Sequence, residues 1–69
     1  MKNWEKAYST HDQYRADLVK SLLENNKVPA IIINKKDTAY NAFGELEVYV
    51  NKHDLVAAIK VIENEIDFE

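Results

Sequence analysis

The sequence predicts a single α+β domain, spanning residues 1–69, whose elements follow the order strand, helix, strand, strand, helix. Two segments are typical of strands: residues 28–33 form an apolar run rich in isoleucine, and residues 45–50 alternate strictly between polar and apolar side chains. Two other segments, residues 10–25 and 51–66, carry apolar residues at spacings of three and four, which is the period of an amphipathic helix.

The first strand is predicted at residues 3–8, where aromatic and apolar residues lie among charges. Alternation along this strand places Trp4, Lys6 and Tyr8 on one face of the sheet. These three side chains are therefore expected to lie together.

The first helix is predicted to start within the sequence STHDQ, residues 9–13. Thr10 is the expected N-cap, because Gln13 lies three residues further on and completes a capping box. The helix should continue to about Asn25. Its expected apolar face consists of Tyr14, Leu18, Val19, Leu22 and Leu23.

The second strand should follow directly, because asparagine tolerates the left-handed conformation that often closes a helix and Pro29 stops its continuation. Residues 28–33 are too apolar for a half-solvated strand, so partial cover on both faces is expected. Since Pro29 cannot donate to a ladder, this strand should lie at a sheet edge. A loop at residues 34–44 then leads into the third strand, whose apolar face consists of Leu46, Val48 and Val50.

The second helix is predicted to begin after Asn51, the best capping residue in this region, with Asp54 in its first turn. Its spacing of apolar residues predicts one buried stripe. This stripe consists of Leu55, Ala58, Ile59, Ile62 and Ile66.

This order of elements predicts a three-stranded antiparallel or mixed sheet with strand order 1-3-2 and both helices on one face. The arrangement is ferredoxin-like but lacks the final strand. The first strand leaves an unpaired edge. The uncovered face should carry Trp4, Tyr8 and Tyr49 beside isoleucines of the second strand, and a patch of this kind predicts an interface. Coverage by the chain's own tail or long loop is the alternative.

Composition argues against several classes of function. The net charge of −3 leaves no basic face for nucleic acid. No apolar run approaches the roughly 20 residues that a membrane span needs, and the first ten residues lack the apolar core of a signal peptide. The chain contains no cysteine, which excludes disulfides and thiolate metal sites and fits a cytoplasmic protein.

Two stretches, YRADLVKSLLENNKVPAIIINKKD and FGELEVYV, carry a pattern that resembles a known family. It is a bacterial domain-of-unknown-function family labelled "putative prokaryotic signal transducing protein", and the resemblance extends from Trp4 to the second helix. The resemblance implies a βαββα core and a role in signalling, with no ligand or catalytic residues to transfer. One departure is Lys27, which stands where such sequences usually have the glycine that closes the first helix.

No catalytic or metal-binding motif stands out, so no enzyme activity, metal or cofactor is predicted. His11 and His53 each fall in the first turn of a predicted helix without a histidine partner four residues away, which favours surface or capping roles. Glu45 and Glu47 share a strand face and could act as paired carboxylates, but simple solvation is the favoured interpretation.

The loop is the predicted binding site, because polar loops on a rigid scaffold often carry function. Its cations, hydroxyls and amide belong to Lys35, Lys36, Thr38, Tyr40 and Asn41. A small anion or a partner protein is the expected ligand, and a solvated hairpin loop is the alternative. The chain is therefore predicted to be a non-enzymatic binding or signalling module and a homodimer. The alternatives are a purely structural interaction subunit and an acid–base enzyme.

Overall fold

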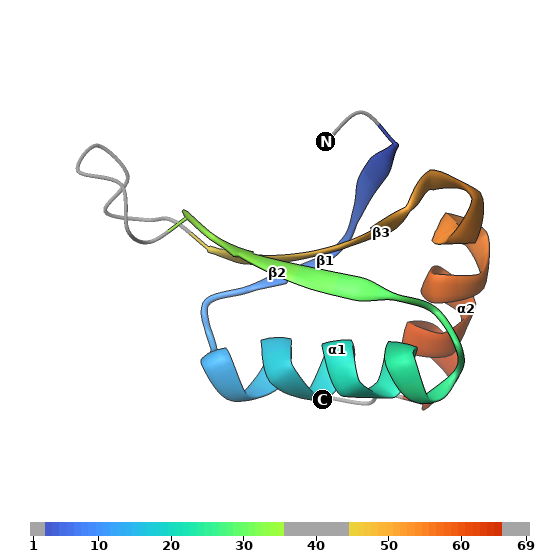
Figure 1. Ribbon diagram of the computed structural model, residues 1–69. Coiled ribbons are helices and arrows are strands. Elements are labelled where there is room, and N and C mark those ends of the chain that lie inside the picture. Colours follow the sequence, from blue (N-terminus) through green and yellow to red (C-terminus); the bar gives the residue numbers. More distant parts are fainter. Residues whose placement is uncertain (1–2, 36–44, 66–69) are drawn as a thin grey trace.

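The computed structural model describes residues 3–35 and 45–65, which form a three-stranded sheet with two α-helices (Figure 1). The elements in chain order are β1 (Trp4–Thr10), α1 (Gln13–Asn25), β2 (Ala30–Asn34), β3 (Leu46–Asn51), the 3-10 helix η2 (Lys52–Asp54) and α2 (Leu55–Glu65). The sheet order is β1-β3-β2, and β3 is antiparallel to both neighbours. The predicted α+β class, βαββα order and strand order are confirmed.

Both helices lie on the same side of the sheet (Figure 1). α1 contacts all three strands, and α2 contacts α1, β1 and β3 at one end of the sheet. The core between these layers consists of Ala16, Val19, Leu23, Val28, Ala30, Leu46, Val48, Val50 and Ala58. The apolar face predicted for the third strand is confirmed, and no described helix covers the other side of the sheet.

A β-bulge divides β1. The register with β3 shifts between Lys6 and Tyr8, so that Lys6 lies opposite Tyr49 whereas Tyr8 lies opposite Val48. Opposed residues share a face of the sheet, so the extra residue, Ala7, moves Tyr8 to the helix side, where it packs against the core. The prediction that Tyr8 shares a face with Lys6 is therefore wrong.

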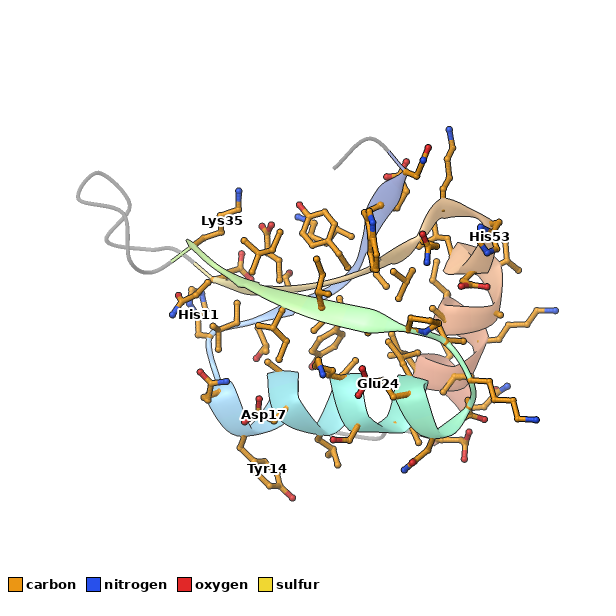
Figure 2. All side chains as sticks on the ribbon, viewed as in Figure 1. His11, Tyr14, Asp17, Glu24, Lys35 and His53 are labelled. Carbon is orange, nitrogen blue, oxygen red and sulfur yellow. The ribbon has the colours of Figure 1, made fainter. Side chains whose placement is uncertain are left out.

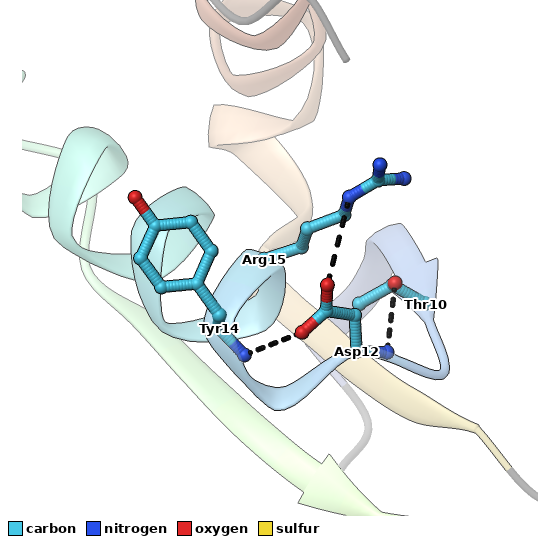
Figure 3. A network of polar contacts seen from close by, with 4 residues as sticks. All are labelled: Thr10, Asp12, Tyr14 and Arg15. Atoms are coloured by element: carbon cyan, nitrogen blue, oxygen red, sulfur yellow. Dashed lines mark hydrogen bonds and ion pairs between the residues drawn. The ribbon is translucent and has the colours of Figure 1, made fainter. Parts of the chain in front are cut away.

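α1 begins after Asp12 rather than after Thr10. The carboxylate of Asp12 accepts a hydrogen bond from the N–H of Tyr14 at 2.9 Å, which satisfies a donor of the first turn (Figure 3). Its other oxygen lies 3.8 Å from Nε of Arg15. Thr10 Oγ1 instead accepts from the N–H of Asp12 at 3.1 Å. The predicted capping box of Thr10 with Gln13 is wrong, because the aspartate takes the capping position two residues later.

The buried stripe of α1 is rotated relative to the prediction. Its fully buried residues are Ala16, Val19 and Leu23, which also follow the helical period. Tyr14 and Leu18, both predicted to be buried, are 71% and 38% exposed. Figure 2 shows Tyr14 pointing away from the sheet. The small residue Ala16 belongs to the buried stripe of α1. A prediction of the buried face from the large apolar side chains alone leaves Ala16 out and therefore gives the wrong rotation of the helix.

α1 ends in a Schellman motif centred on Lys27. The backbone of Lys27 is left-handed, with φ 65°. Its N–H donates to the carbonyl of Glu24 at 3.0 Å, and the N–H of Val28 donates to the carbonyl of Leu23 at 2.9 Å. Leu23 and Val28 are both buried in the core, so this helix end is fixed by backbone hydrogen bonds and by packing.

β2 begins at Ala30, two residues later than predicted. The N–H of Val28 is committed to the end of the helix, and Pro29 has no N–H, so neither residue donates to the sheet. The predicted edge position of this strand is confirmed, since β3 is its one neighbour in the sheet of described residues.

The 3-10 turn η2 connects β3 to α2. Asn51 precedes the turn, but its side chain makes no capping hydrogen bond. The residues of α2 that meet the core are Leu55, Ala58, Val61 and Ile62. Ile59 was predicted to be buried and is 39% exposed, because α2 meets only the end of the sheet and buries a narrow stripe. Ile66 lies outside the described residues. No helix within residues 3–35 and 45–65 has the length and apolar character to cross a membrane.

Candidate functional site

The side of the sheet turned away from both helices is the candidate site, and we call it the open face. The register places an apolar and aromatic group on it: Trp4, Ile31, Ile33 and Tyr49. Ile31 lies directly opposite Tyr49 and is 36% exposed. Two of the three predicted interface residues, Trp4 and Tyr49, therefore lie on the open face, whereas Tyr8 lies on the helix side.

Glu47 is the polar centre of the open face. Its Oε1 accepts a hydrogen bond from the hydroxyl of Tyr49 at 3.0 Å, and its Oε2 lies 3.6 Å from Nζ of Lys6. The side chain of Glu47 is 15% exposed, whereas that of Lys6 is 50% exposed. Both carboxylate oxygens thus have partners, one from β3 itself and one from β1.

The hydrogen bond to Glu47 raises the pKa of Tyr49 above its usual value of 10.0. Burial and the negative charges of Glu47 and Glu5 act in the same direction, because each disfavours the phenolate. Tyr49 therefore keeps its proton through the neutral range and acts as a hydrogen-bond donor. The result is a hydrogen-bonded and ion-paired carboxylate on a face that also carries isoleucine, tyrosine and tryptophan side chains.

This combination is typical of protein interfaces. Interface centres are enriched in aromatic residues, and their few polar groups are hydrogen-bonded. Because Glu47 is already engaged by Lys6 and Tyr49, it contributes an oriented dipole rather than an uncompensated charge. The open face is therefore suited to a partner with its own apolar centre.

Of the predicted loop site, only Lys35 lies among the described residues. Its N–H donates to the carbonyl of Glu45 at 3.0 Å, which extends the pairing of β2 with β3 by one step. Figure 2 shows the side chain of Lys35 at the end of β2, on the side of the sheet away from α1. The structure thus brings Lys35 to the border of the open face. The remaining predicted loop residues, Lys36, Thr38, Tyr40 and Asn41, lie outside the described residues.

The two histidines lie at opposite ends of the molecule (Figure 2). His11 is exposed in the turn before α1. His53 is exposed in η2, and its Nε2 lies 3.7 Å from Oδ2 of Asp54. Within residues 3–35 and 45–65, no group of three or more metal-binding side chains is present.

Sequence reasoning missed the contacts of Glu47. Alternation correctly placed Glu47 and Tyr49 on one face of the third strand, but the hydrogen bond between them was not predicted. Strand order 1-3-2 predicted that the first and third strands pair, but Lys6 could be recognised as the partner of Glu47 only once their register was known.

A family model described as "Putative prokaryotic signal transducing protein" matches residues 4–66. The match includes every strand and helix described above. Neither a curated protein nor a solved structure matches the chain significantly.

Proposed function

We propose that this chain, which belongs to the family described as "Putative prokaryotic signal transducing protein", is a non-enzymatic module. It binds a partner protein on the open face. One observation carries this proposal: Trp4, Ile31 and Tyr49 share with an internally paired Glu47 a sheet face that no described helix covers. A cytoplasmic location suits a chain without cysteine.

A protein partner fits this face better than a substrate does. Acid–base chemistry needs a carboxylate that can exchange a proton with a substrate, and both oxygens of Glu47 are held by Lys6 and Tyr49. The aromatic side chains offer area that a partner surface can cover, and such residues supply much of the binding energy at interfaces.

Site-specific photo-crosslinking in producing cells tests the proposal. A photoreactive residue at Ser9, which lies on the open face opposite Glu47, should give a discrete adduct with one partner protein. The same residue at Val56, which is 68% exposed on α2, should not give that adduct. Trp4→Ala should abolish the Ser9 adduct without unfolding the domain, whereas Tyr14→Ala on the helix side should retain it. Equal labelling from Ser9 and Val56 would contradict the proposal.

A small anion bound beside the open face would give a different result. In that case phosphate or a nucleotide would raise the melting temperature of the wild type, because a ligand that binds the native state stabilises it. A double Lys35→Ala and Lys36→Ala variant would lose this shift. We expect no shift with either anion, and a clear shift would favour the loop rather than the open face as the site.

A further inference from the structure

The outer edge of β2 carries backbone groups directed away from the sheet. β2 is an edge strand, and no described helix or strand lies beyond it (Figure 1). The N–H of Lys35 donates to the carbonyl of Glu45, so the backbone of Lys35 is directed toward β3. This direction alternates along an antiparallel strand, so the N–H and C=O groups of Ala30 and Ile32 point outward.

The two edges of the sheet differ in how they are protected. β1 is interrupted by its bulge and carries the charged residues Glu5 and Lys6, and both features hinder pairing with another strand. β2 reads AIIIN, has no charged residue and shows no register shift against β3. The backbone of Ala30 points outward, so the backbone of the preceding residue, Pro29, points toward β3. The N–H that Pro29 lacks is therefore not one of the outward donors. β2 thus keeps the features of a strand that accepts a neighbour.

We propose that two copies of this chain pair edge to edge through β2, antiparallel, with the two-fold axis at Ile32. Each copy contributes three strands, and the two sheets become one continuous sheet. A two-fold axis makes the contact self-complementary, which closes the assembly at two copies. This inference goes beyond the proposed function and does not depend on it, because the open face stays uncovered.

The register follows from the length of the strand. With the axis at Ile32, that residue faces its own copy, and Ala30 faces Asn34 of the second copy. All of Ala30–Asn34 then lies opposite another strand. A shift of the axis by one residue would leave two residues at one end of each strand without an opposing strand residue, and fewer ladder hydrogen bonds would form.

The side chains are compatible with this register. On the open face, Ile31 of one copy lies opposite Ile33 of the other, and the second such pair is related by the axis. Lys35 lies opposite Pro29, so no like charges are opposed along the strand. Cross-strand pairs of β-branched residues stabilise sheets. Ile31, which is 36% exposed in one copy, would gain an apolar neighbour.

Disulfide trapping tests the proposal, because the chain contains no native cysteine. In the proposed register Ile31 and Ile33 of different copies form a non-hydrogen-bonded pair, with Cα atoms about 4.5 Å apart, which is within the range that a disulfide spans. The variants Ile31→Cys and Ile33→Cys are each oxidised alone and as an equal mixture. Val56→Cys, on the exposed side of α2, serves as the control for random collision. Circular dichroism checks that each variant is folded.

The expected result is a covalent dimer in the mixture, with each single variant no more cross-linked than Val56→Cys. Cross-linking of Ile31→Cys alone at the level of the mixture would move the axis to Ile31 and overturn the register. A mixture that matches the Val56→Cys control would overturn the pairing. Sedimentation equilibrium of the wild type should show a dimer at micromolar concentration, and a monomer up to millimolar concentration would also overturn it. An adduct at Ser9 together with no disulfide dimer would leave the proposed function standing alone.

Discussion

Lys27→Gly is expected to stabilise the protein. Lys27 closes α1 with φ 65°, in the left-handed region, and its N–H is bonded to the carbonyl of Glu24. The β-carbon of a lysine crowds the following carbonyl in this conformation, whereas glycine has no β-carbon. Glycine is therefore the residue that the observed geometry favours at this position.

The magnitude follows from two opposing contributions. A left-handed conformation costs a residue with a β-carbon roughly 1–2 kcal/mol. Glycine removes this cost but loses more chain entropy on folding, which reduces the gain in stability by about 0.5–1 kcal/mol. The balance is a gain in the free energy of unfolding centred on about 0.7 kcal/mol. In a domain of this length, such a gain raises Tm by about 3–6 °C.

Urea melts of three proteins measure this effect. Lys27→Gly should unfold at a higher urea concentration than the wild type, with the same dependence of free energy on urea. Lys27→Ala retains the β-carbon but removes the rest of the side chain, so it should lie close to the wild type. Asn26→Gly should be destabilising, because Asn26 has φ −99° and its side chain donates to the carbonyl of Leu22. A Lys27→Gly variant less stable than the wild type by more than about 0.5 kcal/mol would refute the argument from the β-carbon.

Three further predictions concern the helix start, the core and the open face. Asp12→Ala should cost about 0.5–2 kcal/mol by removing the N-cap of α1, and a neutral result would contradict the assigned cap. Leu23→Ala should cost about 2–5 kcal/mol and Ile59→Ala far less, as measured by denaturant unfolding; equal losses would contradict the observed burial. The pKa of Tyr49 is raised, so the folded state holds the phenol proton of Tyr49 more tightly than the unfolded state does. The contribution of Tyr49 to the free energy of unfolding is therefore complete below pH 10.0 and is lost as pH rises through the folded pKa. Stability should therefore fall less steeply at alkaline pH in Tyr49→Phe than in Tyr14→Phe, and parallel profiles would argue against the hydrogen bond to Glu47.

The strand order was predictable because periodicity and connection length restrict the topologies available. The alternation of Leu46, Val48 and Val50 identified a strand with one buried face, and Pro29 indicated an edge. Helix phase and strand register were harder to predict from the sequence. Ala16 sets the phase of α1, and the bulge near Ala7 depends on how β1 packs against β3, for which the local sequence carries no signal.

The candidate site was predicted in part. Trp4 and Tyr49 were placed on one face by alternation together with an assumed register of the first strand, and this face is the open face of the structure. The ion pair between Lys6 and Glu47 joins the first and third strands, so it depends on long-range register rather than on local pattern. The predicted loop site, apart from Lys35, lies outside the described residues.

The bulge in β1 has a consequence for how this strand can vary. Before the bulge, Trp4 and Lys6 belong to the open face; after it, Tyr8 packs against the core. Under the proposed function, one seven-residue strand is thus under two separate constraints, partner binding at its start and folding at its end. Substitutions at Trp4 should change partner choice at little cost in stability, whereas truncation of Tyr8 should lower the amount of folded protein without changing what it binds. Deletion of Ala7 would make Lys6 and Tyr8 adjacent opposite Tyr49 and Val48, so the two halves would pair in one regular register with Tyr8 still on the helix side.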